Sequence, residues 1–216
     1  MPEKITKREQ RIIEKQKKMQ KLKKIGICAV IICIIVSVCV YAYVTKPEPK
    51  KHNRTATIET SMGTIKIKLY EDKAPITTAN FIELAESGFY DNLTFHRVAK
   101  DFVIQGGDPN GDGTGGSGKT IPWEDTSLKN IKYSVSMARS GDPDTVEGAN
   151  TATSQFFINL KDNQNLDSYT YPFVVFGQVI SGTEVVDAIG ALYPTEPPYD
   201  GHPTTDVIII GVTISE

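Results

Sequence analysis

The first residues that indicate chemistry form the glycine-rich run GDGTGGSGKT at positions 111–120. Gly113, four further residues and then Gly118-Lys119-Thr120 match G-x-x-x-x-G-K-[ST], the loop that binds nucleotide phosphates in P-loop NTPases. In that loop a buried strand delivers the glycines, and a helix beginning at the Lys-Thr pair points its N-terminal amides at the phosphates. The run therefore raises the hypothesis of an ATPase or GTPase.

The sequence around the run does not supply that context. The segment DPNGD at 108–112 consists of polar turn formers rather than the end of a strand, and its two aspartates would repel phosphate. After Thr120, the segment IPWEDTSLKN offers no apolar stripe that a helix could bury. We therefore expect no nucleotide to bind.

The same residues partly match a calcium-binding loop. Positions 1, 3, 5 and 6 of an EF-hand would be filled by Asp108, Asn110, Asp112 and Gly113. Position 12 should be a bidentate glutamate and is Lys119, and flanking helices are not expected. The pattern excludes an EF-hand, leaves a weak adventitious cation site open, and predicts no metal site.

More specific segments lie on both sides of the glycines. They read, in order, FHRVAKDFVIQGGD at 95–108, YSVSMARSG at 133–141, SQFFINL at 154–160 and YPFVVFGQVISGTEVVDAI at 171–189. Together these segments resemble the cyclophilin family of peptidyl-prolyl cis/trans isomerases, and the resemblance covers residues 55–216. Within it, the GTGG at 113–116 corresponds to the family's own glycine loop, followed here by an extra Ser-Gly pair.

The reaction that this resemblance implies needs no cofactor, metal, base or nucleophile. The amide bond before proline has partial double-bond character with a barrier of about 18–20 kcal/mol, so unaided isomerisation takes roughly tens of seconds or longer. A catalyst has to stabilise the twisted amide over the planar one. It therefore needs a donor for the proline nitrogen, an apolar pocket for the pyrrolidine ring, and polar groups that hold the carbonyl side.

The resemblance gives these roles to particular residues. Arg97 matches the family's catalytic arginine, whose guanidinium is a permanently charged, planar set of donors. Its residue type alone would favour a surface arginine in a salt bridge. Gln105 matches a polar group that binds substrate backbone near this arginine, and Phe102, from the proline pocket, completes the predicted catalytic set. His96 is expected to be a structural hydrogen-bonding residue.

Further residues match positions that bind the peptide. The predicted substrate-binding residues are Val103, Ala138, Arg139, Gln155, Phe157, Leu166 and Phe173. The large apolar members form the proline pocket with Phe102, and its walls are expected to be exposed, although aromatic residues on strands usually belong to a core. Arg139 is expected to contact peptide through its main chain, and Gln155 to border the glycine loop.

Several positions depart from the family pattern, including Val103, where the family often has methionine, Asn165, Phe173 and the Arg139-Ser140 pair. Phe173 is assigned to the pocket rather than Tyr171 because it directly precedes VVFG. Asn165 stands where many members carry tryptophan, which implies weak binding of cyclosporin. These changes at Asn165 and Phe173 alter the rim of the predicted proline pocket. They leave a second hypothesis open, in which the domain captures proline-containing peptides or unfolded chains without accelerating isomerisation.

The elements that must position these residues indicate a β protein. Alternating residues at 55–70 predict a hairpin, and further strands are expected at 94–98, 101–105, 133–138, 155–160, 173–180 and in TTDVIIIGVTI. Pro75 suits the first turn of a helix that Gly88 ends, and GTEVVDAIGAL predicts a second helix. The sequence therefore predicts a mainly β fold, a closed antiparallel barrel of eight strands capped by two helices.

The first 54 residues differ from the rest of the chain. Residues 1–24 carry a net charge of +7, whereas residues 55–216 carry −12. The 20 residues at 25–44 contain no charge and no proline, and as a helix they would span about 30 Å of bilayer. Because basic flanks stay in the cytoplasm, we expect a cytoplasmic tail at 1–24, a transmembrane signal anchor at Ile25–Val44, a linker at 45–54 and an extracytoplasmic domain at 55–216.

Alternative readings of the apolar run concern processing. A cleaved signal peptide with small residues at Val40 to Ala42, lipidation at Cys39, and a buried core helix are the competing interpretations. All three cysteines lie inside the run, so the domain has neither a disulfide nor thiol catalysis. The favoured hypothesis is a monomeric, membrane-anchored isomerase whose partners are proline-containing polypeptides exported from the cell, with no nucleic-acid partner.

Overall fold

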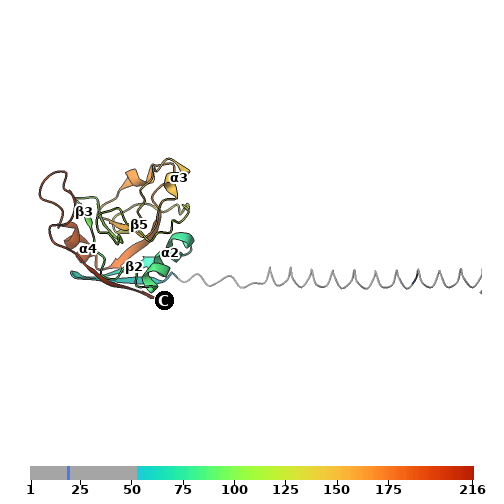
Figure 1. Ribbon diagram of the computed structural model, residues 1–216, viewed down its shortest axis with the longest axis horizontal. Helices are drawn as coiled ribbons and strands as arrows, with labels where there is room; N and C mark the ends of the chain where they lie inside the picture. Colours follow the sequence, from blue (N-terminus) through green and yellow to red (C-terminus); the bar gives the residue numbers. More distant parts are fainter. Residues whose placement is uncertain (1–18, 20–52) are drawn as a thin grey trace, which may run out of the picture. The chain divides into compact units, whose positions relative to one another are not determined.

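The computed structural model describes Met19 and residues 53–216 of the chain (Figure 1). Residues 51–216 form one compact unit. The predicted tail at 1–24, the anchor at 25–44 and the linker at 45–54 lie outside the described residues, apart from Met19 and residues 53 and 54. Within the described part, no helix has both the length and the apolar character needed to cross a membrane.

The N-terminal hairpin follows the predicted alternation. β1 (Thr55–Thr60) and β2 (Gly63–Leu69) pair antiparallel, and their buried side chains alternate with more exposed ones, as the two-residue period of a strand requires. Gly63 has a φ of +135°, and a Cβ there would lie 2.8 Å from the side chain of Val185. Glycine is therefore needed at this turn, and the hairpin predicted at 55–70 is confirmed.

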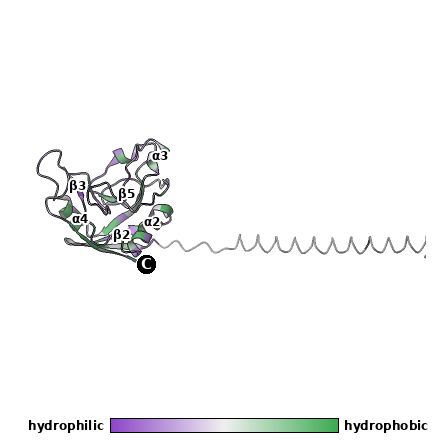
Figure 2. Cartoon of the chain, in the orientation of Figure 1, coloured by the Kyte–Doolittle hydropathy of each residue, from purple (hydrophilic) through white to green (hydrophobic). Residues whose placement is uncertain are grey.

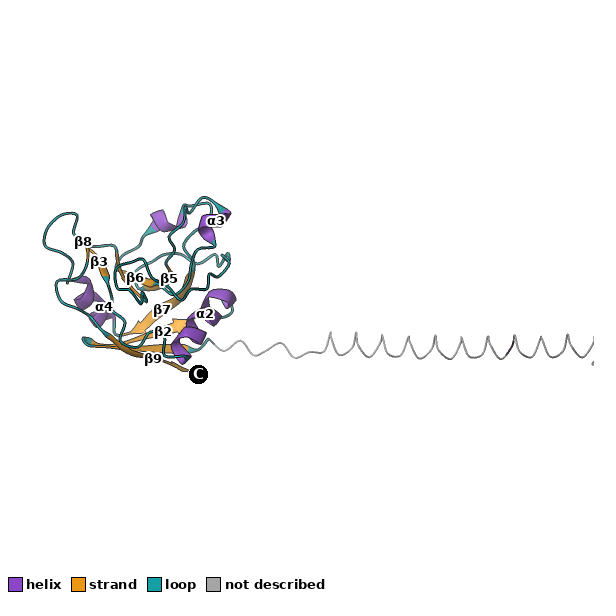
Figure 3. Cartoon of the chain, in the orientation of Figure 1, coloured by secondary structure: helices purple, strands orange, loops and turns teal. Residues whose placement is uncertain are grey.

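Nine strands form one antiparallel sheet (Figure 3). The order across the sheet is β8-β3-β4-β6-β5-β7-β2-β1-β9. The remaining strands are β3 (Arg97–Ala99), β4 (Val103–Gly106), β5 (Ser134–Met137), β6 (Phe156–Asn159), β7 (Val175–Ser181), β8 (Asp200–Gly201) and β9 (Ile209–Ser215). The mainly β, antiparallel character predicted from the sequence is confirmed.

The two end strands, β8 and β9, are not joined by a ladder of their own among the described residues. Instead, Thr94 forms isolated bridges with Ile208 and with Asp108, and the amide of Phe95 donates to the carbonyl of Val207 at 3.0 Å. A curled sheet of nine strands therefore replaces the predicted closed barrel of eight. The end strand β8 is only two residues long, so it offers too short an edge for a ladder with β9, and isolated bridges at Thr94 stand at the seam instead.

Helices cover parts of the sheet. Those in the described region are α2 (Pro75–Glu86), the single turn α3 (Val146–Ala149), the 3-10 helix η1 (Gln164–Asp167) and α4 (Thr183–Gly190). Pro75 begins α2 as predicted, and the carboxylate of Glu124 accepts hydrogen bonds from the free amides of the first turn, including Thr77 at 2.7 Å. α4 is largely apolar (Figure 2) and buries Val186 and Ile189 completely. Both predicted helices are confirmed, whereas α3 and η1 were not predicted.

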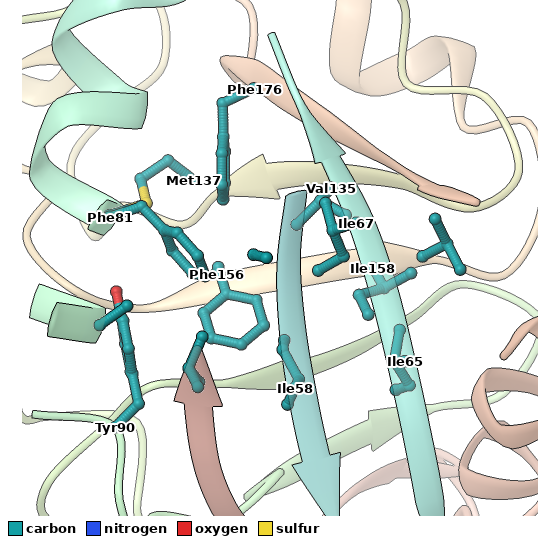
Figure 4. Packing of buried hydrophobic residues seen from close by; sticks show 14 of the residues in the cluster. Ile58, Ile65, Ile67, Phe81, Tyr90, Val135, Met137, Phe156, Ile158 and Phe176 are labelled. Atoms are coloured by element: carbon teal, nitrogen blue, oxygen red, sulfur yellow. The ribbon is translucent and has the colours of Figure 1, made fainter. Parts of the chain in front are cut away.

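An aromatic cluster centred on Phe156 fills the core (Figure 4). The Phe156 ring packs edge-to-face against Phe81 of α2, Tyr90 and Phe95, with centroid separations of 5.6, 5.7 and 6.0 Å. All four side chains are fully buried, and the Tyr90 hydroxyl donates to the carbonyl of Ser154. This arrangement satisfies the polar end of the tyrosine while its ring stays in the core.

Replacing Phe156 by alanine should lower the free energy of unfolding by about 3–5 kcal/mol, because it removes a fully buried ring and leaves a cavity. Chemical denaturation measures the change. Ile210→Ala on β9 is the control, since this side chain is 56% exposed and its loss should change stability by no more than about 0.5 kcal/mol. Equal losses in the two variants would contradict the assigned core.

Candidate active site

A second apolar cluster lies apart from the main core. Its buried members are Ala99, Val103, Phe157 and Leu166, and Phe102, Ala138, Tyr169 and Phe173 pack against them. All five residues predicted for the proline pocket are thus brought together from β4, β6, η1 and the adjoining loops. The prediction that the pocket walls are exposed is only partly right. Phe102 and Phe173 are half-buried, but Val103, Phe157 and Leu166 are at most 6% exposed.

The register of three neighbouring strands places a polar pair beside this cluster. Arg97 on β3 lies opposite Gln105 on β4, which lies opposite Phe157 on β6. Directly opposed residues share one face of the sheet, so the guanidinium, the amide and the aromatic ring stand side by side. A permanent cation therefore borders an apolar surface.

A hydrogen-bonded row runs from the arginine to the glycine loop. Arg97 Nη1 donates to Gln105 Oε1 at 2.9 Å, and Gln105 Nε2 donates to Gln155 Oε1 at 2.8 Å. Gln155 Nε2 then donates to the carbonyl oxygens of Gly113 at 3.0 Å and Gly115 at 2.8 Å. The row fixes the orientation of both amides and ties the predicted polar residues into one unit.

A cavity of about 350 Å³ adjoins this row. It is lined by the glycine loop, by Gln105 and Gln155, and by Ala138, Arg139 and Ser140, among others. The cavity is lined with polar groups, unlike the apolar cluster. The site therefore has the parts of a peptide groove: a cationic donor, an apolar surface for a ring, and a polar recess.

The comparison with protein families decides what this groove is. Residues 55–214 match the family described as Cyclophilin type peptidyl-prolyl cis-trans isomerase/CLD. The chain belongs to this family. The resemblance drawn from the sequence segments is therefore confirmed.

Individual relatives agree with the family assignment. The cyclophilin domain is 40% identical over 141 residues to peptidyl-prolyl cis-trans isomerase CYP18-2 of Arabidopsis thaliana, covering 63% of this chain and 80% of that one. It is 36% identical over 157 residues to peptidyl-prolyl cis-trans isomerase A of Dickeya dadantii, covering 70% and 80%. A crystal structure of a Cryptosporidium parvum cyclophilin type isomerase, determined in the presence of the dipeptide ala-pro, is similar with a TM-score of 0.63 and 31% identity, covering 75% and 99%.

Arg97 has a second partner that sequence reasoning missed. Its Nε donates to Asp200 Oδ1 at 2.7 Å and its Nη2 to Asp200 Oδ2 at 2.6 Å, while both side chains are 35% exposed. The arginine is thus both part of the groove and in a salt bridge, the role that its residue type alone favoured. Asp200 lies 103 residues away in the turn-forming segment PPYDGHP, so no local pattern could have indicated the pair.

The glycine loop of the cyclophilin domain wraps around a carboxylate of the chain itself. Asp108 is buried, and its carboxylate accepts from the amides of Asn110 at 2.9 Å, Asp112 at 3.1 Å and Gly113 at 2.6 Å. A Cβ at Gly115 would lie 2.1 Å from Asp108 Oδ1, so the loop needs glycine there. In the described chain no helix begins at Lys119-Thr120, so a P-loop's essential helix is missing.

Arg139 enters the site through its side chain, whereas the family resemblance implied only its main chain. The guanidinium stacks over the Phe173 ring at 4.5 Å and donates to the carbonyl of Tyr171. Burial lowers the pKa of this guanidinium, and its Nε and Nη1 have no hydrogen-bond partner among the described residues. The stacking holds Phe173 at the edge of the apolar cluster, which supports its assignment to the pocket rather than Tyr171.

His96 does not have the expected structural hydrogen bonds. The ring is 5% exposed, and neither of its nitrogens has a partner among the described residues. Burial lowers the pKa of His96, because the charged imidazolium is disfavoured away from water. The His96 ring therefore packs in the interior without the hydrogen bonds that were expected of it.

Replacing Asp108 by alanine should free the glycine loop, because hydrogen bonds to a charged acceptor contribute about 1.5–3 kcal/mol each. We expect amide hydrogen exchange of Gly113 to rise about tenfold or more, measured by NMR. Asp112→Ala is the matched control, since the Asp112 carboxylate accepts from Thr114 and not from Gly113. An unchanged Gly113 exchange rate in the Asp108 variant would refute the capping role of this carboxylate.

Proposed function

We propose that Arg97, Gln105 and the apolar cluster carry out peptidyl-prolyl cis/trans isomerisation, the activity of the family. The observation that carries the proposal is the register of β3, β4 and β6, which sets a permanent cation beside a surface suited to a pyrrolidine ring. The proline ring packs on the cluster at Phe102 and Phe173, two of its partly exposed aromatic members. The chemistry requires only binding and hydrogen bonding.

Arg97 accelerates the reaction by stabilising the twisted amide. Rotation about the C–N bond removes its resonance, so the nitrogen lone pair becomes able to accept a hydrogen bond. A guanidinium N–H that meets this lone pair binds the twisted form better than the planar one, which is the condition for catalysis. Because a guanidinium stays charged throughout the physiological pH range, the donor is always available.

The polar groups hold the chain that precedes proline. Gln105 and Gln155 are fixed in one orientation by their row of hydrogen bonds, so they can pair with substrate backbone without first being ordered. The adjoining cavity, lined by the glycine loop and by Ala138 and Arg139, receives a side chain that precedes the proline. The chain before proline and the proline ring are then both held by the protein. Binding can therefore favour the twisted amide between them over the planar one.

The same proposal includes a cellular setting. The basic tail at 1–24 and the uncharged run at 25–44 support anchoring in a membrane with the domain at 55–216 outside the cytoplasm. The absence of cysteine from residues 55–216 is compatible with an exported domain. The clients in that setting are proline-containing polypeptides that fold after export.

Replacing Arg97 by alanine should lower kcat/KM for an Ala-Pro peptide roughly 100-fold, the scale seen when one preorganised donor is removed from a transition-state site. Arg97→Lys keeps the charge but loses the planar fork, so it should also be impaired. A protease-coupled peptide assay measures both.

Arg54→Ala is the control for this experiment. Arg54 makes the same kind of two-point pair with Glu71, at 3.1 and 3.0 Å, away from the groove, so its loss should leave kcat/KM unchanged. An unaltered rate in Arg97→Ala would refute the role of Arg97. Peptide binding by the wild type without any acceleration would favour the non-catalytic binding module.

Fractionation tests the cellular setting. In a bacterial host, the full chain should remain with the membranes after carbonate washing, while a chain that begins at Thr55 should not. Protease added to the outside of spheroplasts should degrade the domain of the full chain. Protection of the domain in intact spheroplasts would contradict the proposed orientation.

A further inference from the structure

The ion pair between Arg97 and Asp200 is an additional contact that is not one of the three parts required for the reaction. The two-point contact occupies Arg97 Nε and Nη2 on one edge of the guanidinium, and Gln105 occupies an N–H of Nη1. A guanidinium has five N–H donors, so within residues 53–216 three are engaged and two remain, one on Nη1 and one on Nη2. Asp200 therefore decides which edge of the guanidinium is left for a substrate.

Without this carboxylate the arginine would keep a single side-chain anchor. One hydrogen bond from Nη1 to Gln105 does not fix the plane of the guanidinium, whereas the two parallel bonds to Asp200 do. The arginine side chain is long and 35% exposed, so rotamer freedom would otherwise spread its N–H groups over many positions. The carboxylate removes this freedom before substrate arrives.

The segment that carries Asp200 is attached to β3 by other contacts as well. The amide of Lys100 donates to the carbonyl of Tyr199 at 2.9 Å, and β8 pairs with β3 through Ala99 and Asp200. The Lys100 ammonium also lies 5.0 Å from the ring centroid of Tyr193 and 5.5 Å from that of Tyr199. These contacts do not use the Asp200 side chain, so the segment stays in place when the carboxylate is removed.

The backbone next to Asp200 is strained. Tyr199 has a φ of +58°, a left-handed conformation that bulky residues rarely adopt. Beside this strained residue, the Asp200 carboxylate makes a half-buried, two-point ion pair with Arg97. The arrangement is accounted for if the segment serves to hold a carboxylate against the arginine of the groove.

We infer that Asp200 is a positioning residue for peptidyl-prolyl isomerisation, acting through Arg97 and not on the substrate itself. This inference rests on the proposed function of Arg97. The carboxylate orients the two remaining N–H groups of the guanidinium toward the amide that twists. Because misplacing a reacting group by about 1 Å can cost roughly 100-fold in rate, the orientation affects turnover more than binding.

The experiment compares Asp200 variants of the full chain. Asp200→Ala should lower kcat about tenfold or more while KM for an Ala-Pro peptide stays within about twofold. Asp200→Asn keeps the shape but turns an amide N–H toward the arginine, so it should be impaired as well. Asp200→Glu retains a carboxylate and should recover part of the rate. Glu71→Gln, which breaks the equivalent two-point pair with Arg54, is the control and should leave kcat unchanged.

A double-mutant cycle separates positioning from a general structural role. If Asp200 acts only through Arg97, Asp200→Ala should have no further effect on the rate in an Arg97→Ala background. NMR relaxation of the Arg97 Nε–H group should show increased motion in Asp200→Ala, while the resonances of the core stay unchanged. A loss of rate of equal size in both backgrounds would show a structural role and overturn the inference.

The remaining outcomes are also decisive. A rise in kcat in Asp200→Asn would mean that the carboxylate restrains the arginine, which overturns positioning. An unchanged kcat in Asp200→Ala, with Arg97→Ala still impaired, would overturn the inference and leave the proposed function standing. If Arg97→Ala were itself unimpaired, the proposed role of Arg97 and this inference would fall together.

Discussion

The alternation of side chains along β6 is the constraint on which the rest of the structure depends. Successive strand residues point to opposite faces, so Phe156 enters the aromatic core while Phe157 enters the apolar cluster of the groove. A slip of one residue in register would exchange the two rings and damage the core and the groove together. The stability of the core thus fixes the geometry of the site.

The groove combines two requirements that compete at Arg97. A cation that stabilises a twisted amide should be oriented, but each partner that orients it also uses one of its donors. Asp200 and Gln105 together use three of its five N–H groups, which leaves two without a partner among the described residues. In the apolar half, Val103 and Phe157 are held by packing, and the Arg139 guanidinium stacks on Phe173. Both halves of the groove are therefore supported by neighbouring side chains.

The glycine run shows how one sequence pattern can fit two kinds of loop. In a P-loop the backbone amides face a bound phosphate, whereas here three of the amides between Asn110 and Gly113 face the buried carboxylate of Asp108. The same carboxylate leaves no room for a Cβ at Gly115. The glycines thus serve a tight turn around an internal anion, and the turn lines the recess beside Gln155.

The sequence by itself determined the hairpin at 55–70 and both main helices, because alternation and turn residues act over short stretches of chain. The groove residues were predicted from the resemblance of ordered segments to a family, and the structure brings most of them together. Tertiary structure alone decided that Asp200 meets Arg97 and that Asp108 closes the glycine loop. Within the part of the chain that the structure describes, it also decided that the His96 ring has no hydrogen-bond partner and that nine strands curl without a closed ladder. These features depend on which distant segments the folded backbone brings together. Local periodicity and residue preference carry no information about such pairings, since the contact between Arg97 and Asp200 spans 103 residues.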